Sequence, residues 1–144
     1  MLISSKGRYA IRVLIDLAEN ADGQFKPLKD IAVRQGISQK YMESIMTLLS
    51  KNDCVEAMHG KGVGYRLNKP AAEYNIGDIL RLTEGTLAPV TCLEEGAKPC
   101  GRADKCKTLP LWSGLNKVIS EYLDNISIAD ILDENGIKTE NCEK

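Results

Sequence analysis

The sequence lacks most of the patterns that mark an enzyme or a membrane protein. His59 is the only histidine, which leaves no Ser/His/Asp or Cys/His arrangement of the usual catalytic kind. No apolar run approaches the ~18 to 20 residues that span a bilayer, and the start, residues 1–6, is too short for the core of a signal peptide. We therefore expect a cytoplasmic protein that does not enter a membrane and is not an enzyme.

Glycine and proline are not abundant either. The 12 glycines and 5 prolines are too few for a collagen-like or low-complexity chain. Hydrophobic residues make up 43% of the 144 residues, which is enough for one folded domain of roughly 100 to 150 residues and little more.

The net charge of −1 conceals two halves of opposite sign. Residues 1–70 hold 11 Lys or Arg against 7 Asp or Glu, which gives +4, whereas residues 71–144 hold 8 against 13, which gives −5. A nucleic-acid-binding front and a non-binding rear would produce this asymmetry, although +4 is also ordinary for a domain.

Three helices are expected in the first third of the chain. Apolar residues of 5–19 recur at helical spacing behind Ser4 or Ser5 as N-cap. Residues 26–36 predict a short helix with Pro27 at its first position and Gly36 as its stop. Residues 38–52, capped by Ser38, separate into an apolar and a polar arc. Two short helices joined by a tight glycine turn are typical of a helix-turn-helix.

A hairpin and a fourth helix follow. Residues 54–58 and 63–67 are short β-prone segments on either side of His59-Gly60-Lys61-Gly62. Helix, helix and hairpin together indicate a winged helix, in which the hairpin is the wing. Asn75 then caps a helix that turns Ile76, Ile79 and Leu80 inward and ends at Gly85.

The polar arc of the third helix and the wing tip are candidate DNA contacts. Gln39, Lys40, Glu43 and Thr47 carry groups that could meet base edges in a major groove, although any surface helix presents polar residues to solvent. Lys61, with His59 or Arg66, could meet phosphate or the minor groove, although the glycines also suit an ordinary tight turn.

The region between Gly85 and Lys107 has no clear period and holds three cysteines. Cys92, Cys100 and Cys106 are separated by seven and five residues, which is not the spacing of a zinc ribbon. Three thiolates in one loop could hold an iron–sulfur cluster, act as redox-active thiols, or be incidental. We expect Cys54 to lie in the core and Cys142 to be a tail residue without a role.

A long helix closes the fold. Leu111, Leu115, Val118, Ile119, Tyr122, Leu123 and Ile126 follow helical spacing and predict about four turns with one apolar stripe. We expect a winged helix-turn-helix at 1–70, a linking helix and cysteine loop at 71–107, a dimerisation helix and short C-terminal helix at 108–134, and a polar tail at 135–144. The fold class is mainly α with a small β-hairpin.

These residues together resemble the Rrf2 family of bacterial winged-helix regulators, over residues 1 to about 134. The motifs are Ser4-Ser5-Lys6-Gly7-Arg8-Tyr9-Ala10, Leu28-x-x-Ile31-Ala32, Gly36-Ile37-Ser38, Tyr41-x-Glu43, Gly60-x-Gly62-x-Gly64-Tyr65-x-Leu67 and Ile76-x-Asp78-Ile79. The family includes iron–sulfur cluster regulators, nitric oxide sensors and a cysteine-metabolism repressor.

The resemblance implies a homodimer, formed through a long helix, that binds a roughly palindromic DNA operator. Gln39, Lys40 and Glu43 become the base readers, Thr47 lies on the same face, and His59, Lys61 and Arg8 join the candidate DNA contacts. Cys92, Cys100 and Cys106 match the cysteines that hold a [2Fe-2S] or [4Fe-4S] cluster in cluster-bearing members.

The fourth cluster ligand does not match the family pattern. Leu109 replaces the histidine of cluster-biogenesis regulators, and Arg8 stands where nitric oxide sensors have an aspartate. The fourth ligand could be Asp104, Glu94, Glu95, a residue of the partner subunit or a small thiol, or there could be none. A family regulator without a cluster, controlled by thiol chemistry, a small molecule or a partner protein, is the alternative; a small redox enzyme or electron carrier is a third interpretation.

Overall fold

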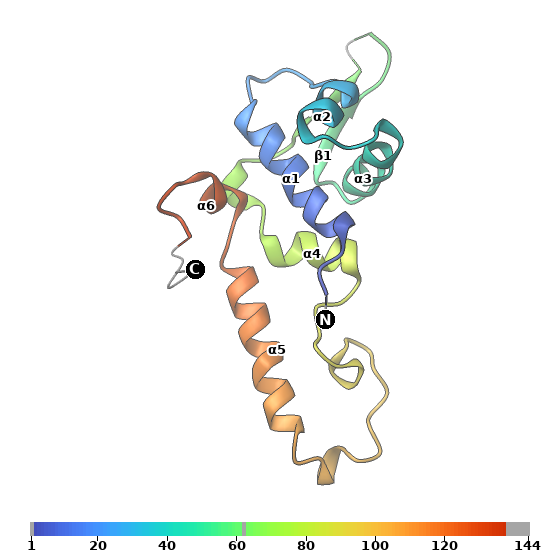
Figure 1. Cartoon of the computed structure of the whole chain (residues 1–144), viewed down its shortest axis with the longest axis vertical. Helices are drawn as coiled ribbons and strands as arrows, with labels where there is room; N and C mark the ends of the chain where they lie inside the picture. The colour runs from blue at the N-terminus through green and yellow to red at the C-terminus, as the bar shows by residue number, and fades with distance from the viewer. Residues whose placement is uncertain (1, 62, 138–144) are drawn as a thin grey trace.

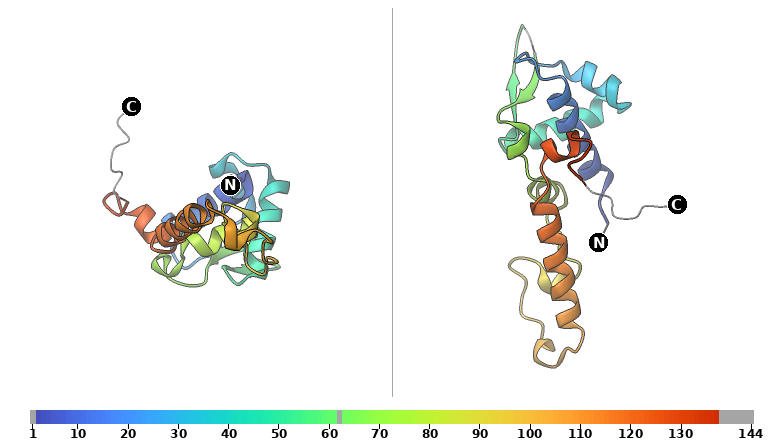
Figure 2. Two further views of the ribbon diagram at one scale, coloured as in Figure 1. Left: turned by 90° about the horizontal axis from the view of Figure 1, so that it is seen from below. Right: turned by 90° about the vertical axis from the view of Figure 1, so that its left-hand side faces the viewer.

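The computed structural model describes residues 2–61 and 63–137, and it consists of a head and an arm (Figure 1). The head contains α1 (Ser5–Glu19), α2 (Leu28–Gln35), α3 (Gln39–Lys51), β1 (Val55–Met58), β2 (Gly64–Leu67), η1 (Ala71–Glu73), α4 (Ile76–Glu84) and α6 (Ile128–Leu132). The arm, residues 85–124, contains η2 (Thr91–Leu93), η3 (Ala103–Lys105) and α5 (Leu109–Asp124). The arm extends away from the head in Figure 1 and in the right-hand view of Figure 2.

The core lies entirely in the head and at its junction with the arm. Four residues on one face of α1 are buried, namely Ala10, Val13, Leu14 and Leu17, as the helical spacing predicts. They pack with apolar side chains of α3 and α4 and with Ile128 of α6, which is fully buried. Burial of such side chains is the main source of stability for a domain of this size.

The turn between α2 and α3 is fixed by two residues that the sequence identified. Gly36 adopts a left-handed conformation with φ 63°, which L side chains rarely adopt, and Ser38 accepts the backbone N–H of Tyr41 at 3.2 Å. Pro27 is the N-cap of α2, not its first helical residue as predicted. Its backbone is extended, while its carbonyl already accepts the N–H groups of Asp30 and Ile31 at 3.0 and 3.2 Å.

The hairpin pairs β1 and β2 in antiparallel register from Val55↔Leu67 to Met58↔Gly64. Its strands are shorter than predicted, because Cys54 and Val63 lie outside them. The N–H of Cys54 closes the end of α3 by donating to the carbonyl of Leu49 at 2.9 Å. Lys26 forms a further bridge to Tyr65, with N–H to O=C distances of 2.8 and 2.9 Å, and so ties the hairpin to the segment before α2.

The arm is attached to the head at the C-terminal end of α5. Arg81 of α4 donates to both carboxylate oxygens of Asp124 at 2.7 and 3.0 Å, and this hydrogen bonding raises the pKa of Arg81. The amide of Asn75 donates to the carbonyl of Asp124, and the N–H of Ile76 to the carbonyl of Ile126 at 2.9 Å. These bonds fix the direction in which α5 leaves the head.

One edge of the apolar stripe of α5 packs against the head, and the other edge is exposed. Ile119 and Leu123 contact the core of the head, and Ile126 follows the helix end. Leu111, Leu115, Val118 and Tyr122 form the other edge, here called the outer stripe, which is 40–62% exposed. No helix of the described residues is long and apolar enough to cross a membrane.

Candidate DNA interface and cysteine loop

The polar arc of α3 is open to solvent along its whole length. Gln39, Lys40, Glu43, Ser44 and Thr47 are all exposed, while Met42, Ile45, Met46 and Leu49 on the opposite face are buried. Within the described residues, Gln39, Lys40 and Glu43 make no side-chain hydrogen bond or ion pair. Their donors and acceptors are therefore available to a ligand that approaches this face.

Contacts from α1 hold α3 in place. The ring of Tyr9 meets the ring of Tyr41 edge to face, with centroids 5.8 Å apart. The guanidinium of Arg12 lies 4.9 Å from the ring centroid of Tyr9, and it donates to the side chain and carbonyl of Gln35 at 3.1 and 2.8 Å. The first turns of α1 thus contact both ends of the turn that leads into α3. Arg8 is exposed beside them and donates to Ser5 at 3.2 Å.

A buried carboxylate that the sequence reasoning missed supports the same turn. Asp16 is 3% exposed and accepts two hydrogen bonds from Nε of Arg34, at 3.1 and 3.0 Å, and one from Nη2 at 2.7 Å. Gln35 donates to it at 2.8 Å, and hydrogen bonding to Asp16 raises the pKa of Arg34. The available signal was an aspartate inside the apolar periodicity of α1, because a buried charge requires partners.

The wing tip presents two of the predicted contacts. His59 and Lys61 are exposed, whereas Gly62 lies outside the described residues. Arg66 is placed differently from its predicted role at the tip. It lies at the base of the wing, where it donates to Glu56 and to the carbonyl of Gly23, both at 2.8 Å, and stacks on Phe25. Its guanidinium therefore stabilises the hairpin.

The cysteine loop is folded as two separate turns. Cys92 lies within η2, and Cys106 is the C-cap of η3, which lies at the far tip of the arm (Figure 1). Cys92 and Cys100 are exposed and Cys106 is half-buried. Within residues 2–61 and 63–137, no group of three or more His, Cys, Asp or Glu side chains is arranged to hold a metal ion. The donor chemistry of three thiols fits an iron–sulfur cluster, but this arrangement does not bring them together.

The surroundings of the cysteines change the pKa values of two thiols. The hydroxyl of Thr108 lies 3.4 Å from the sulfur of Cys106, and this hydrogen bond lowers the pKa of the Cys106 thiol. Cys54 was predicted to lie in the core, but it is half-buried against the core and precedes β1; burial raises its pKa. Cys142 and the rest of the predicted tail from 138 onward lie outside the described residues.

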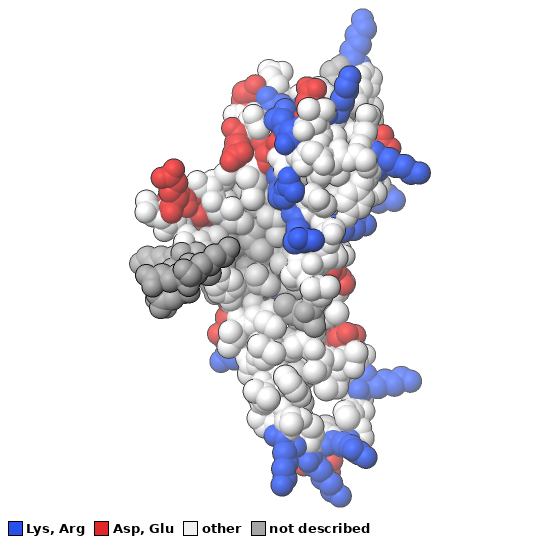
Figure 3. Space-filling model, viewed as in Figure 1, with Lys and Arg blue, Asp and Glu red and all other residues white. Residues whose placement is uncertain are grey.

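Basic side chains gather at both ends of the molecule (Figure 3). On the head they include the exposed Arg8, Lys40 and Lys61. Toward the tip of the arm, the segment that contains Asp104 also carries four exposed cations, namely Lys98, Arg102, Lys105 and Lys107. The basic character of the first half of the sequence is therefore found on the head, but the second half has a basic end of its own.

Comparison with known proteins agrees with this architecture. Residues 3–134 match the family described as Rrf2, iron-dependent transcriptional regulator. The HTH-type transcriptional regulator IscR of Serratia proteamaculans is 35% identical over 137 residues, which cover 95% of this chain and 82% of that protein.

Two solved structures are similar in fold and sequence. CymR, the global cysteine regulator of B. subtilis, has a TM-score of 0.72 and 30% identity, covering 91% of this chain and 95% of that one. IscR of T. potens has a TM-score of 0.71 and 30% identity, covering 96% of this chain and 93% of that one. The chain therefore belongs to the Rrf2 family of DNA-binding transcriptional regulators and is not an enzyme.

Proposed function

We propose that the protein is a cytoplasmic, dimeric repressor or activator that reads a palindromic operator and responds to an iron–sulfur cluster. The observation that carries the DNA-binding part is the exposed polar arc of α3, in which Gln39, Lys40 and Glu43 make no side-chain hydrogen bond or ion pair within the described residues. In this proposal α3 enters the major groove, where Gln39, Lys40, Glu43 and Thr47 meet base edges. His59 and Lys61 of the wing and Arg8 contact the backbone or the minor groove.

The outer stripe of α5 supports a homodimer. Leu111, Leu115, Val118 and Tyr122 leave a continuous apolar face uncovered, which a single chain does not bury. A second copy of α5 would cover it, and two-fold symmetry would then present two α3 helices to two half-sites. This assigns residues 1–70 to DNA binding, 71–107 to sensing and 108–134 to dimerisation.

Cys92, Cys100 and Cys106 would hold the cluster, which supplies a centre sensitive to oxygen, nitric oxide and iron supply. Support comes from the IscR relatives and from the three thiols in one loop. The fourth ligand stays open among Asp104, Glu94, Glu95, a partner residue, a small thiol and none.

The head offers a direct path from this loop to α3. Glu84, the last residue of α4, accepts the N–H and hydroxyl of Ser4 at 3.1 and 2.7 Å, at the start of α1. One turn further along α1, Tyr9 packs on Tyr41 of α3. Ordering of the loop would change the contacts Glu84–Ser4 and Tyr9–Tyr41 and so the position of α3. A coupling free energy of ~1 to 3 kcal/mol between cluster binding and DNA binding would change operator affinity about 5- to 150-fold.

A cluster-free regulator is the second candidate, since CymR is similar in structure and the three thiols stand apart. Anaerobic purification followed by iron and acid-labile sulfide analysis separates the two. Visible absorbance in the wild type that is lost in Cys100→Ala but kept in Cys54→Ala supports the cluster. A wild type that stays colourless after reconstitution points to control by thiol chemistry, a small molecule or a partner protein.

Base reading is tested with Glu43→Ala. Because a carboxylate accepts a hydrogen bond from one particular base, the variant should lose about 1 to 3 kcal/mol of discrimination at one operator position.

Phosphate contact by the wing is tested with Lys61→Ala, which should weaken binding to all DNA sequences. It should also reduce the slope of log affinity against log salt concentration by about 1. Lys117→Ala, on the exposed side of α5, is the matched control. Unchanged discrimination in Glu43→Ala would remove this residue from the interface.

A further inference from the structure

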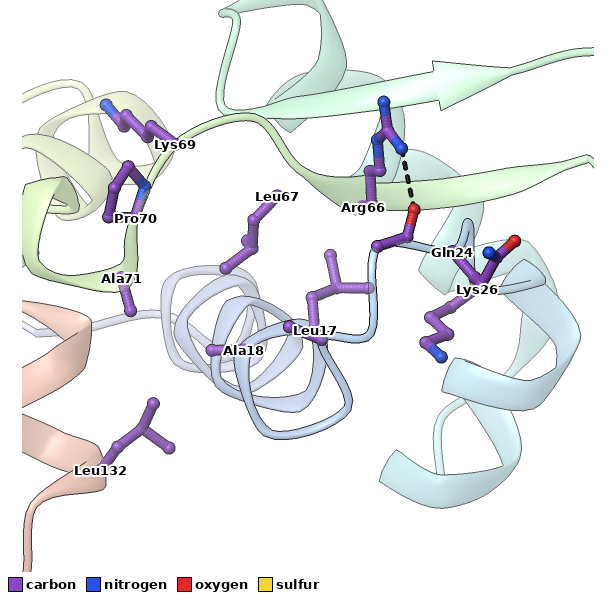
Figure 4. A pocket seen from close by; sticks show the side chains of 12 residues that line it. Leu17, Ala18, Gln24, Lys26, Arg66, Leu67, Lys69, Pro70, Ala71 and Leu132 are labelled. Carbon is purple, nitrogen blue, oxygen red and sulfur yellow. Dashed lines mark hydrogen bonds between the residues drawn. The ribbon is translucent and has the colours of Figure 1, made fainter.

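A cavity of about 280 Å³ lies where the base of the wing meets the C-terminal helix (Figure 4). Its walls come from the end of α1 and the following segment, from β2, from residues 69–71 and from Leu132 of α6. Of the DNA contacts predicted from the sequence only Arg66, which the structure places at the base of the wing, lines it, and none of the loop cysteines does. It is therefore separate from the interface and from the sensing loop described above.

The floor of the cavity is apolar. The side chains of Leu17, Leu67, Ala71 and Leu132 point toward the common space, and Ala18 lies beside them (Figure 4). Pockets that enclose drug-sized ligands measure ~300 to 1,000 Å³, so this one suits a smaller molecule. Apolar walls of this size favour a short aliphatic chain or a single ring.

The rim of the cavity carries only positive charge. Lys26, Arg66 and Lys69 line it, and no aspartate or glutamate does. Lys26 is paired with Asp22 and Arg66 with Glu56, both at 2.8 Å. Lys69 forms no ion pair with a described carboxylate and lies over the ring of Tyr74, 4.7 Å from its centroid. Arg66 uses two of its five N–H donors in the bonds to Glu56 and Gly23, which leaves donors for a ligand.

We propose that this cavity is a binding site for a small amphipathic monocarboxylate. The alkyl or aryl part lies on the leucine floor, and the carboxylate meets the cations at the rim. Neutral molecules of the same size gain the apolar contact but lose the charge-assisted hydrogen bonds, which are roughly twice as strong as neutral ones.

Binding would also affect the wing, because Arg66 and Leu67 belong to β2 and Lys26 bridges to Tyr65 beside them. A ligand that contacts β2 and α6 together would stabilise one position of the hairpin relative to the head. This effect on DNA affinity rests on the proposed function, whereas binding itself does not.

The binding test uses the full-length protein without DNA and three probes: hexanoate, phenylacetate and the neutral hexanamide. Titration of ¹⁵N-labelled protein should shift amide signals of Leu67, Ala71 and Leu132. Hexanoate should bind about 10-fold or more tightly than hexanamide, since hydrogen bonds to charged groups contribute that much. Equal affinities for hexanoate and hexanamide would show that the site does not recognise a carboxylate. Amide signal shifts confined to the outer stripe of α5 would show that the probes do not bind in this cavity.

Two variants locate the site independently. Lys69→Met keeps the aliphatic part of an exposed side chain but removes its charge. It should weaken the binding of hexanoate about 10-fold and leave the binding of hexanamide unchanged. Ala71→Leu fills the cavity and should abolish binding of every probe, with circular dichroism as the check on folding. Lys117→Met, on α5 and away from the cavity, should bind as the wild type does. Unchanged hexanoate binding in both cavity variants would refute the proposal.

A final measurement separates this inference from the proposed function. Operator binding by fluorescence anisotropy, with and without saturating hexanoate, should change in the wild type and not in Lys69→Met. If hexanoate binds but the operator affinity is constant, the site has no effector role. If no DNA is bound at all, the proposed function fails while the binding result stands.

Discussion

The head and the arm of this molecule are stabilised in different ways. The head buries 16 hydrophobic residues, nearly all within its own helices and hairpin, whereas Leu87 is the one buried hydrophobic residue among the described residues of the arm and no residue of α5 is buried. The arm contacts the head through the half-buried side chains of Ile119 and Leu123 and through Arg81–Asp124, an ion pair whose side chains are 36% and 40% exposed. Pairs this accessible contribute only about 0 to 1 kcal/mol.

This difference shows which part buries its own apolar surface. A head with a closed core specifies its own structure, whereas an arm with an exposed outer stripe and two short 3-10 turns needs something further to bury its apolar surface. In our proposal a second copy covers α5 and a cluster orders the loop. Substitutions in the head should therefore act on stability, and those in the arm on assembly.

The largest effect is expected from a charge on the outer stripe. Val118 is 62% exposed in the single chain, so Val118→Glu should leave the head folded. In a dimer the carboxylate would be desolvated, and loss of the second half-site should weaken specific operator binding by about 100-fold or more. Sedimentation velocity gives the mass, and anisotropy the affinity.

Ser113→Glu is the matched control for this variant. Ser113 is exposed on a different face of α5, so the new charge stays in water and the dimer should persist. A Val118→Glu protein that sediments as the wild type does would contradict dimerisation through the outer stripe.

An intermediate effect is expected when the buried carboxylate of the head is removed. Asp16→Ala deletes the acceptor of Arg34 and Gln35 and should lower the free energy of unfolding by about 2 kcal/mol. Urea denaturation followed by circular dichroism measures the change. Asp22→Ala, which removes a solvent-exposed partner of Lys26, should change stability little. Equal losses in both variants would show that burial of Asp16 adds nothing.

The smallest effect concerns the attachment of the wing. A Cβ at Gly64 would lie 2.5 Å from the carbonyl oxygen of Lys26, so Gly64→Ala must separate the hairpin from that segment. We expect a loss of about 1 to 2 kcal/mol, typical of overpacking, with a matching rise in amide exchange at Tyr65. Gly101→Ala in the arm meets no atom within 4 Å and serves as control. Wild-type exchange at Tyr65 would contradict the role given to Gly64.

The sequence predicts the head well because local signals and the core agree there. Ser4, Ser38 and Asn75 cap the helices as expected, and Gly36 ends α2. Strand limits were less accurate, since the backbone N–H of Cys54 bonds to α3 and not to the hairpin. The hydrophobic periodicity of a sequence reports which side chains are buried. It does not report whether the N–H of Cys54 bonds to α3 or to the hairpin.

The arm was predicted less completely for a physical reason. Helical spacing groups Val118 with Ile119 and Tyr122 with Leu123, but only the head and a partner decide which member of each pair turns inward. The three cysteines were found from sequence, yet their assembly depends on loop backbone that no periodic pattern specifies. Asp16 was overlooked because its partners, Arg34 and Gln35, lie on another helix.

Because of the cations at the tip of the arm, cleavage of the loop by trypsin would depend on how well the loop is ordered. Arg102, Lys105 and Lys107 are exposed trypsin sites between α4 and α5, within residues 94–108, none of which is buried. Proteases cut where the backbone can open locally, and such opening costs least where packing is sparse. A cut here would separate α1–α4 from α5 and α6, and the head would lose the covalent link to the buried Ile128. The lifetime of the regulator in a cell would therefore depend on whatever holds these turns together.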